Sequence, residues 1–300
     1  MSYHNPVLLK ESVDALNIQP DGIYVDVTFG GGGHSREILS RLGENGKLFA
    51  FDQDDDALKN AIDDDRFTLI NENFRHIKSF LRLYGVKKVD GILADLGVSS
   101  HQFDEADRGF STRFNAKLDM RMNQNDKTSA YEVINYYDEK KIADILFQYG
   151  ELRNSRAIAK EIVNAREEKK IETSFELKEV LKRFLPKAKE HKILAQIFQA
   201  IRIEVNEEID ALKEFLLQTI DLLKDKGRLS VISYHSLEDR LVKRLIQKGK
   251  FEGEPEKDFY GNVSLPFKKV GKFILPTKEE IKENNRARSA KLRVAERIRI

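Results

Sequence analysis

The sequence predicts an α/β fold in which a parallel, doubly wound sheet is interrupted by an all-helical insertion. Two observations carry this expectation. In the first third of the chain, short apolar runs alternate with helical patterns, as in a parallel sheet flanked by helices. From about residue 108 to 193 no convincing strand is seen, and a β run then resumes at Arg228–Ser233. In such sheets the carboxyl ends of the strands share one edge, where ligands bind.

The alternation in the first third predicts each element in order. The expected strands are Ile23–Val27, Lys47–Phe51, Phe67–Asn71 and Val89–Leu93. The expected helices between them are Ser35–Leu42, Asp56–Ile62 and Ile77–Tyr84.

The middle of the chain carries apolar residues at helical spacing instead. Pro186 and the polar run 187–192 close this block, and one long helix follows with apolar residues from Ile201 to Leu223, ending at Lys226-Gly227. We therefore expect a helical insertion over 108–193. The sheet domain would be built from 1–107 and 194–300.

Composition limits the classes of function. The chain has 300 residues, with 52 basic against 50 acidic side chains, so net charge does not indicate a nucleic-acid binder. The segment Arg286–Ile300 is rich in Arg and Lys, which predicts either a solvated charged helix or an arm that contacts phosphates. There is no cysteine, which excludes disulfides, thiolate metal sites and covalent cysteine catalysis, and no metal site is expected. No apolar run is long enough to cross a bilayer, so we expect a soluble cytoplasmic protein.

The most informative stretch is the turn after the first expected strand. Four glycines, Gly30 to Gly33, join a strand to a helix, and the next strand ends in Asp52. Such a turn lets backbone amides approach a ligand, and an acid about 20 residues further on is placed to bind ribose hydroxyls. The dinucleotide fingerprint is incomplete, however, and the Lys-Ser or Lys-Thr of a phosphate-binding loop is replaced by His34-Ser35.

The acidic surroundings favour a cationic cofactor with free hydroxyls, which S-adenosylmethionine is. We assign Gly32, Gly33 and His34 to its methionine end, Asp52 to its ribose, and Phe74 to its adenine. For Phe74 alone, simple core packing is the commoner role.

The fourth strand ends in Asp95, next to Gly97. A carboxylate there could accept an N–H of an exocyclic amine and assist its methylation. It could equally hold the cofactor, and the sequence does not separate the two roles. At the end of the fifth strand Ser233, Tyr234 and His235 offer a ring and an imidazole to a base. Ser236 with Asp239 has capping-box spacing at the start of the next helix.

Long segments of the chain resemble the bacterial 16S ribosomal RNA cytosine-N4 methyltransferase family (RsmH/MraW). The resembling segments are 4–11, 28–35, 95–100 with Gln102, 108–111, 118–122, 198–206, 233–240 and 288–293.

The resemblance implies a class I, Rossmann-like methyltransferase fold with a helical insertion for substrate recognition. It further implies S-adenosylmethionine as methyl donor and a cytidine N4 in the decoding region of 16S rRNA, in the small ribosomal subunit, as acceptor. The implied cofactor residues are Gly32, Gly33, His34, Asp52, Phe74, Asp95 and Gln102. We take Arg202, Asn206, Ser233, Tyr234 and His235 as the candidate substrate residues, and Asp95 as the catalytic candidate that hydrogen bonds to the acceptor amine.

The segment His191–Gln196 departs from the family pattern, as do Thr112 and Lys117, which affects expectations for RNA contacts only. The strand–turn–helix with Asp52 also suits a nicotinamide dehydrogenase, and a third reading is an RNA-binding assembly factor without activity. Monomer and homodimer are both compatible with the sequence.

Overall fold

The computed structural model describes residues 6–255, 259–261 and 263–299. The chain divides into two compact units, one made of 1–97 and 209–300 and the other of 98–208. His4 and Asn5 of the first resembling segment, and the last residue of the basic tail, lie outside the described residues.

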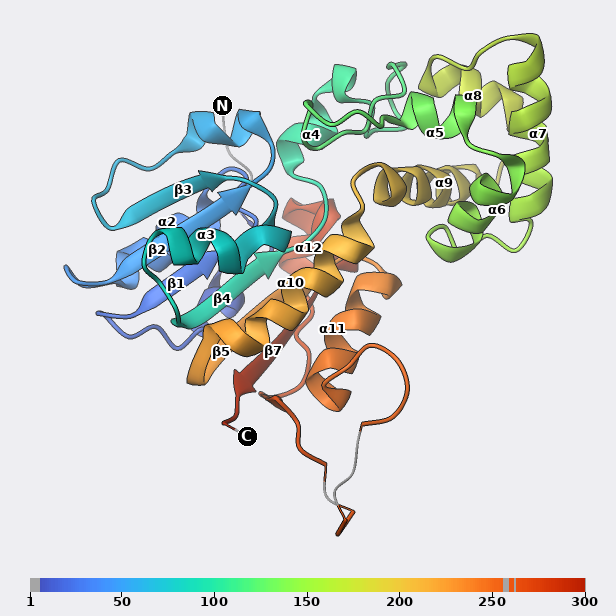
Figure 1. Cartoon of the computed structure of the whole chain (residues 1–300). Helices are drawn as coiled ribbons and strands as arrows, with labels where there is room; N and C mark the ends of the chain where they lie inside the picture. The colour runs from blue at the N-terminus through green and yellow to red at the C-terminus, as the bar shows by residue number, and fades with distance from the viewer. Residues whose placement is uncertain (1–5, 256–258, 262, 300) are drawn as a thin grey trace. The chain divides into compact units, whose positions relative to one another are not determined.

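The first unit is built on a seven-stranded sheet with the order β3-β2-β1-β4-β5-β7-β6 (Figure 1). Its strands are β1 (Ile23–Asp26), β2 (Lys47–Asp52), β3 (Phe67–Asn71), β4 (Val89–Asp95), β5 (Leu223–Ser233), β6 (Phe267–Lys269) and β7 (Lys291–Arg297). The first five run parallel, and β7 is antiparallel to both β5 and β6. The predicted α/β fold is confirmed, and the chain order reverses between β1 and β4, where open α/β sheets bind ligands.

Helices pack on both faces of this sheet. The α-helices are α1 (Leu9–Asp14), α2 (Gly33–Arg41), α3 (Ile77–Leu83), α10 (Glu208–Leu222), α11 (Ser236–Lys248) and α12 (Lys278–Glu283), with 3-10 turns η1 (Asp55–Asn60), η2 (Phe74–His76) and η5 (Asn285–Ser289). Side chains alternate along each strand, so Phe49 and Phe51 join the core under α3, α10 and α11, whereas Leu48 joins that under α1 and α2. No helix in the described residues has both the length and the apolar character needed to cross a membrane.

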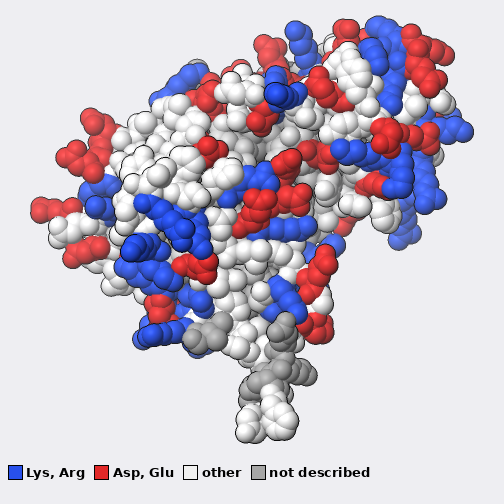
Figure 2. All heavy atoms as spheres, viewed as in Figure 1, with Lys and Arg blue, Asp and Glu red and all other residues white. Residues whose placement is uncertain are grey.

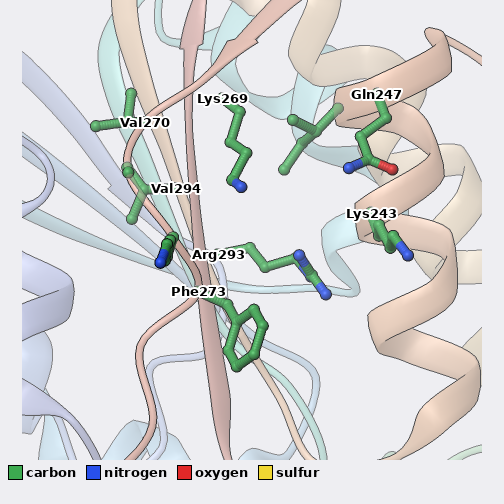
Figure 3. A pocket seen from close by; sticks show the side chains of 10 residues that line it. Lys243, Gln247, Lys269, Val270, Phe273, Arg293 and Val294 are labelled. Atoms are coloured by element: carbon green, nitrogen blue, oxygen red, sulfur yellow. The ribbon is translucent and has the colours of Figure 1, made fainter.

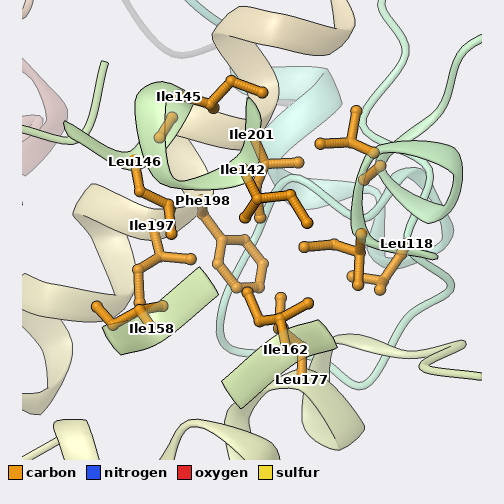
Figure 4. Close-up of a cluster of buried hydrophobic side chains, with 14 of the residues drawn as sticks. Leu118, Ile142, Ile145, Leu146, Ile158, Ile162, Leu177, Ile197, Phe198 and Ile201 are labelled. Carbon is orange, nitrogen blue, oxygen red and sulfur yellow. The ribbon is translucent and has the colours of Figure 1, made fainter. Parts of the chain in front are cut away.

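The second unit is helical. It contains α4 (Ser100–Asp104), α5 (Ala130–Tyr136), α6 (Glu139–Gln148), α7 (Ser155–Glu168), α8 (Ser174–Val180) and α9 (Glu190–Val205), with η3 (Ala106–Arg108) and η4 (Lys182–Phe184). Its own core centres on Phe198 of α9, surrounded by branched aliphatic side chains (Figure 4). Because α9 contributes to this core along its length, the helical unit extends to 208 rather than to the predicted 193, and it begins at 98 rather than 108.

The single long helix predicted up to Gly227 is wrong. α9 ends at Val205 and α10 starts at Glu208, because Glu207 takes a left-handed backbone conformation with φ 48°. The Asn206 side chain hydrogen bonds to the carbonyl oxygen of Arg202 at 2.9 Å and so competes with the helix. The apolar period continues across the break, which is why periodicity alone did not locate it.

The basic C-terminal segment is neither a solvated helix nor a free arm. It forms η5 and then β7, which lies between β5 and β6 in the interior of the sheet. Leu292 is fully buried, and its charged neighbours Lys291 and Arg293 are partly buried on the other side of the pleat. Asp239 forms ion pairs with Arg293 at 2.6 Å and with Lys291 at 3.0 Å. These pairs give Lys291 and Arg293 a structural role.

The start of α11 also differs from expectation. His235, not Ser236, is the N-cap residue, and Glu238 accepts a hydrogen bond from the Tyr234 amide at 2.8 Å. The predicted partner Asp239 is instead engaged by β7, so sequence spacing placed the cap one residue too late.

Burial of β7 yields a prediction. Leu292→Ala removes a fully buried side chain and should lower the free energy of unfolding by about 2–5 kcal/mol. Chemical denaturation monitored by circular dichroism measures this change. Leu275→Ala is the matched control, because Leu275 is 55% exposed. Equal stability of the two variants would contradict the placement of β7 inside the sheet.

Candidate active site at the carboxyl edge of the sheet

Three aspartates end three neighbouring parallel strands of the first unit. Asp26 closes β1, Asp52 closes β2 and Asp95 closes β4, so all three lie on the carboxyl edge beside the glycine turn. The topology that brings them together is the reversal of strand order at β1. In the described structure they form one acidic site.

The glycine turn has backbone constraints that only glycine meets. Gly30 and Gly32 have φ values of 50° and 76°, in the left-handed region. A Cβ on Gly32 would lie 2.9 Å from the Phe29 ring, and one on Gly33 would lie 2.1 Å from Pro6 Cγ. The tight turn therefore brings the first amides of α2 to the edge of the sheet. Pro6 occupies the space that a side chain at position 33 would need.

Asp52 is held by the turn itself. Its Oδ2 accepts a hydrogen bond from the Gly30 amide at 2.7 Å, and its Oδ1 accepts one from the Asp54 amide at 2.9 Å. Burial nevertheless raises the pKa of Asp52 to about 6, and the nearby charges of Asp54 and Asp26 add to that rise against the two amide bonds. Each oxygen keeps a lone pair for a hydroxyl donor.

Asp26 is the most deeply placed carboxylate of the site. It has no exposed surface, and its oxygens accept hydrogen bonds from the Ser35 hydroxyl at 2.7 Å and the Thr28 amide at 3.1 Å. Burial raises the pKa of Asp26 to about 6. Sequence spacing does not single out Asp26, because nothing in it shows that the Ser35 hydroxyl lies against this carboxylate.

Asp95 is positioned by residues from three elements. The Tyr234 hydroxyl donates to Asp95 Oδ1 at 2.7 Å, and the Asp95 amide donates to Thr28 Oγ1 at 2.7 Å. The Nδ1 atom of His34 lies 4.0 Å from Asp95 Oδ2. Burial raises the pKa of Asp95 to about 6, although the hydrogen bond from Tyr234 opposes the rise. The pKa of Tyr234 is itself well above its usual value, through burial and the Asp95 charge, so its hydroxyl stays a donor.

The His34 imidazole has a defined role in this arrangement. Burial lowers its pKa, so the ring is neutral, and its Nε2 lies 3.3 Å from the carbonyl oxygen of Val7. Because a carbonyl can only accept, Nε2 carries the proton and Nδ1 presents a lone pair. Two acceptors, His34 Nδ1 and Asp95 Oδ2, therefore face each other across 4.0 Å. A ligand with N–H donors, such as an ammonium or an exocyclic amine, satisfies both.

Several predicted residues of the first unit make contacts within the fold. The Phe74 ring packs edge-on against Phe215 with centroids 5.3 Å apart, a core contact. The Ser233 hydroxyl donates to the Lys291 carbonyl oxygen at 3.4 Å. His235 Nε2 lies 3.1 Å from Glu238 Oε1. Their roles toward a cofactor or a base stay predictions.

The remaining predicted residues belong to the helical unit. Gln102 forms a capping box with Ser99, in which each side chain accepts from the other's amide at 3.1 Å. Arg202 makes two hydrogen bonds to Glu208, at 2.8 and 2.9 Å. Asn206 binds the backbone at Met120 and Met122. These contacts organise the unit, and ligand roles for the three residues stay predictions.

Comparison with known proteins decides the family. The model of the MraW methylase family matches residues 1–298. The chain belongs to the MraW methylase family. A relative from Christiangramia forsetii is 70% identical over 99% of both chains, and one from Flavobacterium johnsoniae is 68% identical over 99% of both. One from Bacteroides fragilis is 57% identical over 99% of this chain and 98% of its own. All three are named ribosomal RNA small subunit methyltransferase H.

This methylase uses S-adenosylmethionine, and the carboxyl edge fits that cofactor. Buried carboxylates with raised pKa values suit a sulfonium and an ammonium, because a nearby positive charge stabilises their ionised forms. The amides at the start of α2 suit a carboxylate. The lone pairs of Asp52 suit the hydroxyls of a ribose.

The raised pKa of Asp26 yields a prediction about stability. Its folded-state pKa of about 6 exceeds its usual 3.8, so the folded protein binds the proton more tightly than the unfolded chain does. Stability from this group is therefore greatest below about pH 4 and is lost as the pH rises to about 6, a loss of roughly 3 kcal/mol. Asp26→Asn removes the charge. The free energy of unfolding of this variant, minus that of wild type, should therefore increase as the pH rises from about 4 to about 6.

Denaturation curves at several pH values measure this difference. Asp64→Asn is the control: Arg66 holds the pKa of Asp64 at about 2, so the difference between this variant and wild type should stay constant between pH 4 and 7. If the difference in free energy of unfolding between Asp26→Asn and wild type stays constant from pH 4 to 7, the pKa of Asp26 is not raised by burial.

Proposed function

We propose that this methylase transfers the methyl group of S-adenosylmethionine to the N4 amine of a cytidine in the decoding region of small-subunit ribosomal RNA. One observation carries the proposal. The chain is 70% identical, over 99% of both chains, to a protein named ribosomal RNA small subunit methyltransferase H. The resemblance of its motifs to the cytosine-N4 family supplies the acceptor atom.

The carboxyl edge supports an amine as acceptor. The lone pair of an exocyclic cytosine amine is delocalised into the ring, which makes it a poor nucleophile. Asp95 Oδ2 and His34 Nδ1 can each accept an N–H of that amine, which favours a pyramidal nitrogen with its lone pair free. Bound S-adenosylmethionine supplies an electrophilic methyl group on a positively charged sulfur.

Asp95 is the residue that would take the proton. The amine becomes positively charged as its nitrogen gains the methyl group, and a carboxylate with a pKa of about 6 is ionised at neutral pH and ready to accept. Tyr234 donates to Oδ1 and so directs Oδ2 toward the acceptor. We assign Asp95 the acceptor role for this reason, and leave the ribose to Asp52.

The residues of the helical unit are proposed to contact RNA, with Arg202 and Asn206 as the substrate residues of that unit. Location in the cytoplasm follows from the proposed substrate, because bacterial small subunits are assembled there.

The substrate assignment is tested with labelled S-adenosylmethionine and small subunits from a strain that lacks the modification. Nucleoside analysis should show label on cytidine N4 in the small-subunit RNA. Label on another atom or no label at all would contradict the proposal.

The Asp95 role gives a separate prediction. Asp95→Asn should lower kcat by about 100-fold or more, because the proton acceptor is lost, while the Kd for S-adenosylmethionine stays within a few-fold of wild type. Single-turnover kinetics and calorimetry measure the two quantities. A raised Kd with unchanged kcat would instead place Asp95 on the cofactor.

A further inference from the structure

The outer edge of the sheet carries a basic groove far along α11 from the aspartates. A shallow hollow is lined by residues of α11, of β7 and of the connection 269–273 (Figure 3). It shares Ile246, Gln247 and Lys269 with a second, open hollow of about 610 Å³ beside β6. We call the two together the edge groove. None of Asp26, Asp52 and Asp95 lines it.

The lining of the edge groove is of one charge sign. It includes no Asp or Glu among its described residues, and its cations are Lys243, Lys268, Lys269, Lys272, Arg293 and Arg299. In Figure 3 the side chains of Lys269, Arg293 and Gln247 converge between β7 and α11. On the face seen in Figure 2 the two signs are mixed. A groove without carboxylates is therefore unusual on a chain with a net charge of only +2.

Carboxylates on the neighbouring elements are already paired. Asp239 of α11 is bound by Arg293 and Lys291, and Glu254 by Lys248. Glu296 of β7 pairs with Arg228 at 2.9 Å, and it stands opposite Lys268 in the ladder. Within the described part of the chain, Lys243, Lys269 and Lys272 have no carboxylate at ion-pairing distance.

An aromatic ring lies beside these cations. Phe273 is 46% exposed, and its centroid lies 5.4 Å from the Arg293 guanidinium carbon and 5.2 Å from Lys291 Nζ. Exposed rings between cations are the elements with which proteins bind single-stranded nucleic acid, since the ring stacks on a base while the cations neutralise phosphates.

We propose that the edge groove binds the phosphate backbone of a single-stranded segment of the substrate RNA outside the target nucleotide. The proposal rests on the proposed function, which supplies RNA as the substrate. Lys243, Lys269 and Lys272 contact phosphates, and Phe273 stacks on a base. The groove thereby adds affinity for RNA without taking part in methyl transfer.

The experiment measures binding of a fluorescein-labelled small-subunit rRNA fragment containing the target cytidine, between 0.1 and 1 M salt. The full-length chain carries Lys243→Gln, Lys269→Gln and Lys272→Gln together. Loss of three phosphate contacts should reduce the slope of log K against log salt by about 2, which is roughly 100-fold weaker binding at 0.1 M. Phe273→Leu should weaken binding without changing the slope.

The matched control carries Lys47→Gln, Lys87→Gln and Lys88→Gln, three exposed lysines of the same unit outside the groove. It should keep the wild-type slope, and both triple variants should keep wild-type thermal stability and affinity for S-adenosylmethionine.

If the two triple variants have equal slopes while wild type methylates small subunits, the groove proposal is overturned and the proposed function stands. If wild type neither binds nor methylates small-subunit RNA, both fail. Binding of labelled poly-glutamate is measured in the same way. If the variant with Lys243→Gln, Lys269→Gln and Lys272→Gln loses affinity for poly-glutamate but keeps its affinity for RNA, the groove binds an acidic protein, and the proposal is also overturned.

Discussion

The site depends on three carboxylates that the fold brings to one edge of the sheet, with Asp26 fully buried and Asp52 and Asp95 partly buried. Burial opposes their ionisation and raises their pKa values to about 6. The fold compensates with donors that are fixed before any ligand arrives: the amides of Gly30, Asp54 and Thr28, and the hydroxyls of Ser35 and Tyr234. The unfavourable energy that remains is relieved by a cation. A methyl donor with a positive sulfur supplies it, so strain in the free protein favours binding of the right ligand.

The interior position of β7 also depends on charges that the fold balances. A basic strand in the middle of a sheet requires that its charged side chains find partners. Asp239 of α11 provides them for Lys291 and Arg293, and the one acid of the strand, Glu296, is paired with Arg228 of β5. Once these acids are used, the lysines of the outer edge keep their full positive charge. The same residues that allow β7 to be buried thus leave the edge groove open to an anion.

Much of this could be predicted from the sequence. Alternating apolar runs placed the first four strands and fixed the sheet edge on which Asp52 and Asp95 lie, because strand patterns and glycine turns are local signals. What could not be predicted depends on tertiary contacts. The Tyr234 to Asp95 hydrogen bond joins residues 139 positions apart, and the break at Glu207 lies within an uninterrupted apolar period. The strand β7 could not be predicted, because its basic side chains form ion pairs with Asp239 of α11 and no sequence spacing indicates these pairs.

The central claim is that a positively charged ligand stabilises the ionised forms of these carboxylates. It is tested most directly by counting the protons released when the cofactor binds. Calorimetric titration of S-adenosylmethionine near pH 6, in buffers with different ionisation enthalpies, gives this number. The account predicts that protons are released, because the bound positive charge lowers the pKa values of the aspartates, and that S-adenosylhomocysteine, whose sulfur is uncharged, releases fewer. Equal release by the two ligands, or no release by either, would contradict it.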